Sequence, residues 1–431
     1  MPVPGAHEPC GDAVAEPGQH RIVVTGLGAV SPVGNTAPDS WASIRAGRGG
    51  ITRITHFDPG ILPVQIAGEV KEFDPVARFG TKEARRGTPH VLYAMAAARE
   101  AVEDARLDIA ASSPDVGVLI ASGIGGLEVL EQATRTLDNQ GARRVSPFAA
   151  AMALVDMASG MVAIDLGARG PNMAVVSACA SGADAIGQAA NWIMQSDAVA
   201  VLAGGTEAGI TSTGIAMFAA ARALSTRNDD PEHASRPFDR DRDGFVAAEG
   251  SAVLVLEERE HAIARGATIL AELLGYGASS DAYHITAPDP SGAGAVRSMR
   301  RALERAGVQT QDIGYINAHG TGTPLNDAAE TRAIKEVFGD HASSVPVSSS
   351  KSMTGHMLGA AGVFESIVTI LAMRDGFLPP TVNLEHPDPE CDLDYIPNVG
   401  RVADVQLAMT TSFGFGGHNS CLVFAGVPAS A

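Results

Sequence analysis

The sequence predicts an α/β fold in which helices cover the faces of sheets. Short apolar runs rich in β-branched residues alternate with helix-like stretches through almost the whole chain. The 431 residues, 45% of them hydrophobic, exceed one average domain, so we expect two core units or one large duplicated unit. Aromatic residues make up only 5% while Ala and Gly are abundant, which favours closely packed layers.

The first half is expected to contain five buried strands and two helices. A stretch rich in charge, Asn and Pro, Ser225–Asp243, interrupts the pattern, and we expect a long surface loop there because strand-like sequence follows without a break. The expected strands are Arg21–Thr25, Val116–Ser122, Met173–Ser177, Ala198–Leu202 and Ala252–Leu256, and the expected helices are Val91–Ala105 and Ala183–Met194.

The second half repeats this order of elements, which suggests a duplication. The last predicted helix ends before Pro379 and Pro380, which cannot continue it. The expected strands are Leu270–Gly275, Ile313–Asn317 and Val345–Ser349, the helices Ala295–Ala306, Ala328–Phe338 and Gly362–Asp375, and the final apolar runs, joined by a Gly-rich turn, Gln406–Ser412 and Cys421–Phe424.

The chain divides into a leader, 1–20, and two halves, 21–267 and 268–431. The leader holds Pro, Gly, Glu, Asp and two His but lacks the basic start and apolar stretch of a signal peptide, so we expect it to be disordered. No apolar run is long enough to span a bilayer, which predicts a soluble, cytoplasmic protein without a membrane partner.

The charge balance argues against a nucleic-acid partner. Lys and Arg number 31 and Asp and Glu 49, giving a formal charge of −18, and there is no basic tract. The four cysteines, Cys10, Cys179, Cys391 and Cys421, form no CxxC pair, so we expect reduced thiols and no metal site.

One cysteine lies in a pattern that suits a nucleophile. In Val175–Gly187, V-V-S-A-C-A-S-G-A-D-A-I-G, a strand is expected to end near Ser177 and a helix of small residues to begin near Cys179. The unsatisfied N–H groups and positive dipole end of a helix N-terminus favour the thiolate. A packed structural cysteine explains this segment equally well.

Two further segments carry the imidazoles and a cation. In Asn317–Asp327, N-A-H-G-T-G-T-P-L-N-D, a strand delivers His319 into a Gly/Thr loop, although a histidine that caps a turn would look the same. Ser348–Gly362, S-S-S-K-S-M-T-G-H-M-L-G-A-A-G, places Lys351 and His356 on a Ser/Gly loop. That loop lacks the Walker spacing, but an anion-binding or merely solvated loop remains an alternative.

A last segment, Thr411–Asn419, reads T-S-F-G-F-G-G-H-N and offers a backbone N–H beside a movable ring, or simply a tight hairpin. Together the four segments supply a nucleophile, two imidazoles, a cation and a backbone donor. Each lies at a strand end, where sites gather in α/β folds.

These motifs resemble the β-ketoacyl-[acyl-carrier-protein] synthases of the thiolase superfamily, with the closest match to the type II elongating synthase. The resemblance runs from about Arg21 to Phe424 and includes Ala223–Gly250 and the S-D-A-Y-H-I-T stretch Ser280–Thr286. It implies a thiolase-like layered α-β-α-β-α fold built from two duplicated halves.

The resemblance implies a decarboxylative Claisen condensation of malonyl-[acyl-carrier protein] with an acyl group on Cys179, in fatty acid biosynthesis. The backbone N–H groups of Cys179 and Phe415 would form the oxyanion hole. His319 and His356 would donate hydrogen bonds to the malonyl thioester carbonyl, where charge develops as CO₂ leaves.

Lys351 would orient the site through Glu330 and would keep both imidazoles neutral. No cofactor is implied for the enzyme itself, because the phosphopantetheine belongs to the acyl carrier protein. Thr321 and Thr323 would bind the phosphopantetheine amides, and Phe415 would gate the acyl pocket. The other substrate-binding residues implied are Ile124 at the pocket floor, where isoleucine suggests tolerance of long chains, Phe218, Phe413 and, at the partner's pocket, Ala149.

The acyl carrier protein of such systems is acidic, so an enzyme of charge −18 would need a local basic patch for docking. For any single residue of this patch, a solvated surface charge is the alternative. The positions at which the family docks its carrier correspond to Lys82, Arg85, Arg86, Arg143, Arg144 and Arg222.

The sequence departs from the family pattern at three places. Arg86–Tyr93 lacks the usual Met-Asp and aromatic residues, Phe148–Met157 has alanines at 149–151 that would reshape the partner's pocket, and Thr411 replaces an Asn. These changes keep open a second reading, a ketosynthase subunit of a type II polyketide or polyene synthase. Such a subunit pairs with a chain-length-factor homologue, so both a homodimer and a heterodimer are possible.

Two readings from other classes fit less well. A non-catalytic structural partner would have lost the nucleophile, and Cys179 is present. A thiolase acting on coenzyme A esters would need a second cysteine in a loop, whereas Cys421 lies inside a predicted strand.

Overall fold

The computed structural model describes residues 20–427, and its main feature is one ten-stranded sheet with the order β10-β9-β13-β14-β8-β1-β7-β6-β4-β5. The predicted α/β alternation is confirmed. The strands are β1 (Ile22–Val30), β4 (Val116–Ala121), β5 (Asn172–Met173), β6 (Ala200–Glu207), β7 (Gly250–Glu258), β8 (Ala271–Ser280), β9 (Tyr315–Asn317), β10 (Val347–Ser348), β13 (Leu407–Gly414) and β14 (His418–Gly426).

Each half of the chain supplies five neighbouring strands of this sheet, and the two sets of strands follow in mirrored order from the middle outward. Strands β1, β7, β6, β4 and β5 come from residues 22–258, and β8, β14, β13, β9 and β10 come from residues 271–426. The halves join where β1 pairs with β8 in antiparallel fashion, for example Ile22 with Leu273. Strand β6 of the first half and strand β13 of the second half therefore occupy equivalent positions, each the third strand from the junction.

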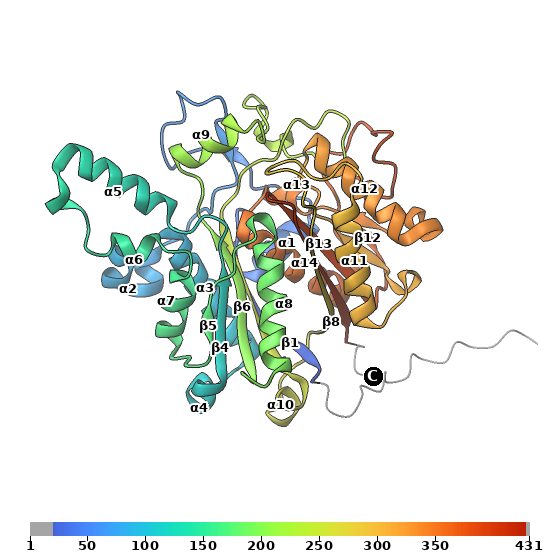
Figure 1. The fold of residues 1–431 in the computed structure, drawn as a ribbon, viewed down its shortest axis with the longest axis horizontal. Coiled ribbons are helices and arrows are strands. Elements are labelled where there is room, and N and C mark those ends of the chain that lie inside the picture. The colour runs from blue at the N-terminus through green and yellow to red at the C-terminus, as the bar shows by residue number, and fades with distance from the viewer. Residues whose placement is uncertain (1–19, 428–431) are drawn as a thin grey trace, which may run out of the picture.

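Helices form layers on both sides of these strands (Figure 1). The helices α8 (Ser181–Met194) and α14 (Ala361–Asp375) pack on each other and contact strands of both halves, so they form the central layer. The helices α3 (Pro89–Ala105) and α11 (Ala293–Ala306) cover β1 and β8 from outside. This arrangement matches the predicted layered α-β-α-β-α fold.

Glycines form the seam between the halves near the central helices. A Cβ atom on Gly205 of β6 would lie 2.3 Å from the carbonyl oxygen of Gly359, and one on Gly182 of α8 would lie 2.8 Å from the same oxygen. A Cβ on Gly362 would lie 2.7 Å from the backbone nitrogen of Ala183. The backbones of the two halves are thus in direct contact, with no side chain between them.

The segment from α5 to β5 carries a concentration of exposed large apolar side chains. Helix α5 (Leu127–Gln140) has no buried residue and extends away from the body in Figure 1. Helices α6 (Ala149–Ala153) and α7 (Met157–Leu166) follow it, and β5 is the edge strand of the sheet. We call this segment, residues 127–176, the arm; its exposed large apolar side chains are Leu130, Leu137, Phe148, Leu154, Ile164, Met173 and Val176.

The remaining helices and small strands complete the described part of the chain, in which no helix is both long and apolar enough to cross a membrane. The small strands pair as β2 with β3 and β11 with β12. The bounds are α1 (Ala37–Arg45), α2 (Pro75–Arg86), α4 (Ile109–Ser112), α9 (Ser212–Ala220), α10 (Arg259–Ala264), α12 (Pro324–Phe338), α13 (Lys351–Thr354), β2 (Thr52–Arg53), β3 (Ile66–Ala67), β11 (Phe377–Leu378) and β12 (Arg401–Val402).

Two predictions about local structure are wrong. The strand expected at Met173–Ser177 is only Asn172–Met173, because the chain leaves the sheet edge to make the turn that holds Cys179. The loop Ser225–Asp243 is not a surface loop throughout, since Ala234–Asp239 is buried and its charges are paired internally. The predicted leader, apart from His20, lies outside the described residues.

Candidate active site

Cys179 lies in a strained turn between the sheet edge and α8. Residues Ala178–Ala180 form a 3₁₀ turn, and Ala178 has a left-handed φ of 51°. The hydroxyl of Ser181 fixes this turn, because it accepts from the backbone N–H of Ser177 at 2.8 Å and donates to the Ala178 carbonyl at 2.6 Å. Cys179 therefore precedes the regular helix, which begins at Ser181, and is half-buried.

The prediction that the helix terminus makes this thiol acidic is wrong for the free chain. Burial raises the pKa of the Cys179 thiol to about 11, and the nearby charge of Glu207 acts in the same direction. The charge of Lys351 and the backbone N–H groups of Phe415 and Cys179 lower this pKa, but they do not outweigh burial. The same two N–H groups that the resemblance assigns to the oxyanion hole thus face the sulfur.

His319 follows β9 and is fixed by its backbone. Its N–H lies 2.8 Å from an oxygen of Glu330 and 3.0 Å from the Thr411 hydroxyl, and that hydroxyl donates to Glu330 at 2.7 Å. Gly320 donates to the other Glu330 oxygen at 2.8 Å. The Thr411 that departs from the family pattern therefore takes part in the network around His319.

Lys351 holds the side chain of His319, although not through the residue that the sequence suggested. Its ammonium donates to the His319 carbonyl at 2.7 Å and lies 3.3 Å from Nδ1 of the ring. The ion-pair partner of Lys351 is Glu365 of α14, not Glu330. Because an ammonium can only donate, Nδ1 of His319 is an acceptor and the ring proton is on Nε2.

His356 lies edge-on to His319, with ring centroids 5.3 Å apart and an interplanar angle of 84°. Both of its ring nitrogens are buried and have no hydrogen-bond partner among the described residues. Burial, and then the charge of Lys351, hold the pKa values of both histidines well below the usual range. Both imidazoles are therefore neutral at physiological pH, as the sequence predicted.

A cavity of about 80 Å³ unites these groups. It is lined by Cys179, His319 and His356, and by the predicted Thr321, Thr323, Phe413 and Phe415. The sequence reasoning did not single out the other eight lining residues, although the quoted stretch Ser280–Thr286 contains two of them. The missed residues are Ala223, Phe245, Asp281, Thr286, Pro288, Asn326, Gly414 and Asn419.

Three predicted substrate-binding residues lie outside this cavity. Ile124 and Phe218 pack with Cys179 in one hydrophobic cluster, and the Phe218 and Phe415 rings are 6.4 Å apart. Ala149 borders a different cavity beside Arg144, so the chain does not bring it to its own Cys179.

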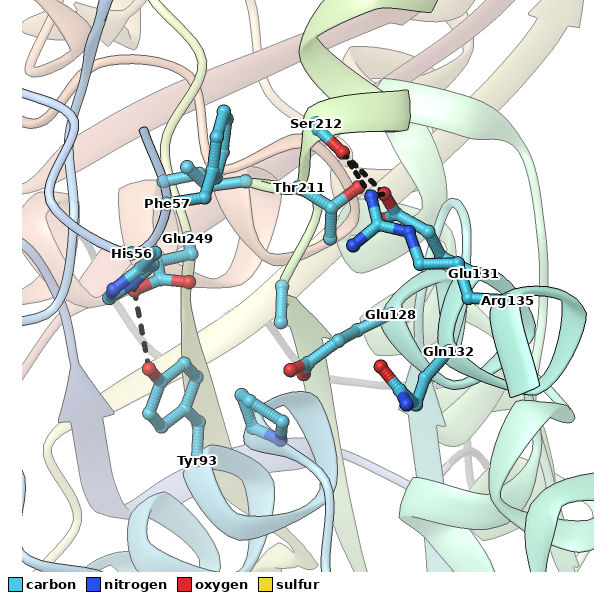
Figure 2. A pocket seen from close by; sticks show the side chains of 13 residues that line it. His56, Phe57, Tyr93, Glu128, Glu131, Gln132, Arg135, Thr211, Ser212 and Glu249 are labelled. Atoms are coloured by element: carbon cyan, nitrogen blue, oxygen red, sulfur yellow. Dashed lines mark hydrogen bonds and ion pairs between the residues drawn. The ribbon is translucent and has the colours of Figure 1, made fainter. Parts of the chain in front are cut away.

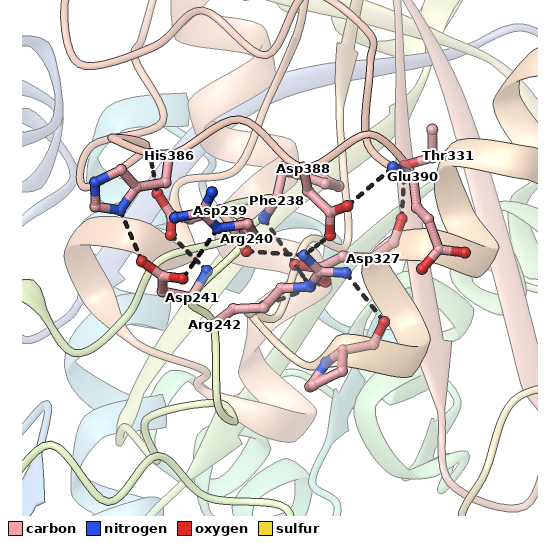
Figure 3. Close-up of polar contacts among 12 residues, drawn as sticks. Phe238, Asp239, Arg240, Asp241, Arg242, Asp327, Thr331, His386, Asp388 and Glu390 are labelled. Carbon is pink, nitrogen blue, oxygen red and sulfur yellow. Dashed lines mark hydrogen bonds and ion pairs between the residues drawn. The ribbon is translucent and has the colours of Figure 1, made fainter.

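An ionic network anchors the turn that carries Thr321 and Thr323 (Figure 3). Asp327 accepts from the N–H groups of Gly322 at 3.2 Å and Phe238 at 2.8 Å, and it lies 3.7 Å from Arg242. Burial raises the pKa of Asp327, while Arg242 lowers it. This network explains why the loop Ser225–Asp243 is drawn into the protein.

At the outer end of this network, Asp239, Asp241 and His386 are close enough to share an ion. Both carboxylates already have partners within the protein. Asp239 pairs with Arg236 and accepts three backbone N–H groups, and Asp241 pairs with Arg240 and His386.

The six predicted docking residues are all exposed. Lys82, Arg85 and Arg86 lie at the end of α2, and the Arg86 guanidinium sits 5.6 Å from the Phe148 ring centroid. Arg143 and Arg144 lie within the arm, in the turn between α5 and α6. Arg222 follows α9.

A second cavity, of about 320 Å³, is lined in part by residues 208–212, the segment that follows β6 (Figure 2). It is lined mainly by polar groups from α5, the His56 loop and that segment. Nε2 of His56 is 2.7 Å from Glu249, whose carboxylate also accepts from Tyr93, and the hydrogen bond to Glu249 raises the pKa of His56. The carboxylate of Glu128 faces the same space.

The chain matches the family descriptions "Beta-ketoacyl synthase, N-terminal domain" over residues 19–262 and "Beta-ketoacyl synthase, C-terminal domain" over residues 270–385. It is 52% identical to the 3-oxoacyl-[acyl-carrier-protein] synthase 2 of Synechocystis sp., with 94% of this chain and 97% of the relative covered. It is 51% identical to the Coxiella burnetii protein of the same name, with 95% and 99% covered.

Two solved structures are also similar over 95% of this chain and 100% of their own. One is a type II polyketide ketosynthase bound to the hexaketide and in complex with its acyl carrier protein, with 34% identity and a TM-score of 0.88. The other is the ishigamide ketosynthase/chain length factor, with 35% identity and a TM-score of 0.89.

Proposed function

Because this chain belongs to the β-ketoacyl synthase family, we propose that Cys179 carries its acyl group and that His319 and His356 assist its condensation with malonyl-[acyl-carrier protein]. The product is a 3-oxoacyl-[acyl-carrier protein] two carbons longer, and the pathway is fatty acid biosynthesis. One observation carries the assignment of roles. Both ring nitrogens of His356 are buried without a partner, and they share a cavity with Cys179.

The first step is the transfer of the acyl group from the carrier to Cys179. The thiol gives up its proton, its sulfur attacks the thioester carbonyl carbon, and the phosphopantetheine thiol leaves with a proton. The N–H groups of Cys179 and Phe415 stabilise the oxyanion, and such a donor contributes on the order of 3 kcal/mol. Burial raises the pKa of the Cys179 thiol in the free chain, and the charge of Lys351 and these two N–H groups act in the opposite direction, towards the thiolate.

The second step forms the carbon–carbon bond. The bond between Cα and the carboxylate of the malonyl group breaks, CO₂ leaves, and negative charge develops on the thioester oxygen. Nε2–H of His319 and one N–H of His356 donate to that oxygen. The carbanion then attacks the acyl carbonyl, and the bond from that carbon to the Cys179 sulfur breaks. Each neutral imidazole keeps one N–H, and this N–H is the donor to the developing oxyanion.

Access to the sulfur requires movement. A cavity of about 80 Å³ is far smaller than the roughly 300–1,000 Å³ of ordinary ligand pockets. Phe415 lies between Gly414 and the pair Gly416 and Gly417, which have left-handed φ values of 83° and 76°. We assign the gate to Phe415 because glycines on both sides let its backbone and ring move without strain.

The acyl carrier protein is the proposed macromolecular substrate. A structural neighbour at 34% identity is recorded in complex with its acyl carrier protein. In this chain the exposed cations of α2 and of the α5–α6 turn are the proposed docking groups for that acidic protein.

A second copy of the chain is the proposed partner of the arm. Helix α5 buries none of its residues, and β5 is the outermost strand at its end of the sheet within residues 20–427, beside the exposed Met173 and Val176. A partner that covers this face would bring Phe148 and Ala149 to the pocket of the other subunit. The fatty acid pathway and a homodimer are preferred to a polyketide heterodimer, since identity is 51–52% to the synthase 2 relatives but 34% to the type II polyketide ketosynthase and 35% to the ishigamide ketosynthase/chain length factor.

The test is intact-mass analysis of the full chain after incubation with acyl-[acyl-carrier protein] of increasing chain length, followed by malonyl-[acyl-carrier protein]. We expect one acyl adduct on Cys179, its loss on addition of the malonyl substrate, and a 3-oxoacyl product. Cys179→Ala is the control and should acquire no adduct. A wild-type protein that stays unmodified, or a labelled residue other than Cys179, would refute the proposed function.

A further inference from the structure

Glu207, at the end of β6, is a buried carboxylate that the proposed mechanism does not use. Its exposed fraction is 0%, and no cation is paired with it among the described residues. Burial raises its pKa, as expected for a carboxyl group taken from water without an ion-pair partner. A group this costly to bury needs an explanation from its contacts.

Those contacts come from two different segments beside the site. One carboxylate oxygen accepts from the Ser122 hydroxyl at 2.9 Å, and both oxygens bind the loop after β4 through the N–H groups of Gly123 at 2.8 Å and Ile124 at 3.3 Å. The second oxygen also accepts from the N–H of Gly359 at 3.0 Å. A single side chain therefore ties the Ile124 loop to the loop that follows His356.

The two loops approach this carboxylate so closely that a residue larger than glycine would collide with it. Cβ atoms on Gly123 and on Gly359 would each lie 2.9 Å from the same Glu207 oxygen. Leu358, between His356 and Gly359, holds a left-handed φ of 45°, which costs energy for a leucine. The four hydrogen bonds thus maintain a strained loop in a fixed place.

The fixed segments form a wall. Two residues after Glu207, a Cβ on Gly209 would meet Cδ1 of Ile124 at 3.4 Å and Cδ1 of Leu358 at 3.7 Å. These side chains belong to the cluster that contains Cys179. On the other side, Ala208 and Ile210 line the 320 Å³ cavity together with Glu128 (Figure 2). The wall therefore separates the surroundings of Cys179 from an existing cavity.

We propose that Glu207 is a positioning residue that sets the acyl chain length accepted on Cys179, because it holds Ile124 and Leu358 in place as the wall between the acyl pocket and the second cavity. The inference rests on the proposed function. Loss of its charge loosens both loops at once, opens the wall towards the cavity and favours longer chains over shorter ones.

The experiment compares wild type with Glu207→Gln, which keeps the size of the side chain but replaces one acceptor oxygen by an NH₂ group. The rate of Cys179 loading is measured by intact mass with acyl-pantetheine thioesters of six to sixteen carbons, and kcat/KM is obtained for each. We expect the ratio of long-chain to short-chain kcat/KM to rise by about fivefold or more, in line with the modest discrimination that apolar pockets provide. Ser122→Ala, which removes one of the four donors, should move the ratio in the same direction by less.

Glu257→Gln is the matched control. Glu257 is also fully buried, but it lies at the other end of the β6–β7 pair, opposite Ala200, and binds Thr25 and Arg265. It should lower the melting temperature without changing the chain-length ratio. A second readout is the pH dependence of Cys179 alkylation by iodoacetamide, whose midpoint should fall in Glu207→Gln because a negative charge near the sulfur is removed.

An unchanged ratio, an equal loss at all chain lengths, or a shift towards shorter chains would overturn the inference. These outcomes differ from failure of the proposed function, because that failure appears as an unloaded Cys179 in the wild type. If Glu207→Gln does not fold, Ser122→Ala takes its place, and the ratio of long-chain to short-chain kcat/KM in that variant tests the inference.

Discussion

The surroundings of His319 and the arm differ in burial: polar and charged side chains are buried around His319, whereas large apolar side chains are exposed in the arm. Around His319, Lys351 and His356 the exposed fractions are 1–2%, and the backbone and charges are held by Glu330, Glu365 and Thr411. In the arm, α5 buries nothing and large apolar side chains face outward. The candidate catalytic groups are thus assembled within one chain, whereas the arm leaves large apolar side chains exposed to solvent.

The largest expected effect comes from the reacting group itself. Cys179→Ala removes the acyl acceptor, so condensation should fall on the order of 10⁴-fold or more. Loading followed by intact mass and product formation followed by chromatography measure this loss. The melting temperature and the oligomeric state should stay close to wild type, and a variant that still forms an acyl adduct would contradict the assignment.

Lys351→Met should reduce kcat on the order of 10²-fold, because the His319 tautomer loses its fixed donor. It should also move the pH midpoint of Cys179 alkylation to a higher value than in the wild type. The sign follows from the charge: Lys351 lowers the pKa of the thiol, so its removal raises that pKa. Glu365→Gln is the companion variant, and a downward shift of the midpoint in Lys351→Met would contradict the described electrostatics.

Leu130→Asp combined with Met173→Asp should dissociate the proposed dimer while leaving the monomer folded. Each leucine-sized side chain contributes about 1.5–3 kcal/mol when buried, so the dissociation constant should rise on the order of 10²-fold or more. Analytical ultracentrifugation measures the change. The matched control is Ile61→Asp with Val402→Asp, two apolar residues that are 92% and 86% exposed outside the arm. If both double variants had the same dissociation constant, the proposal that the arm is the dimer interface would be contradicted.

Arg143→Glu with Arg144→Glu should have the smallest effect, a rise of about tenfold in KM for acyl-carrier substrates and no change for small thioesters. The effect should shrink at high salt, because exposed charges are screened. Arg53→Glu, at an exposed arginine in β2, is the control. If small thioesters suffer equally, the docking role is wrong.

The sequence could bring most of the candidate catalytic groups together because each is carried by a short motif at a strand end. Cys179, His319, His356 and Phe415 meet in one cavity as expected. The partner of Lys351 was assigned wrongly, since Glu330 lies near His319 in the sequence while Glu365 reaches the site from α14. A charged residue inside an otherwise apolar helix was the available signal for Glu365.

Short motifs could not predict the pKa of Cys179 or the position of the wall formed by Ile124 and Leu358. The thiol pKa depends on a balance between burial and several charges that no motif encodes. The left-handed Ala178 arises from the contacts of Ser181 with its own turn, and alanine gives no local hint of it. The sequence did not predict that α5 is exposed, because its residue pattern resembles that of a helix packed against the body.

The glycine seam has a consequence for protein engineering. Gly182, Gly205, Gly359 and Gly362 let the backbone that carries the nucleophile touch the backbone that carries the imidazoles, so the distance between them is set by peptide groups alone. No choice of side chain can widen or narrow it gradually, since even a single methyl group is too large. Mutant libraries that aim at new substrates should leave these four codons constant and draw their diversity from Ile124, Phe218 and the arm.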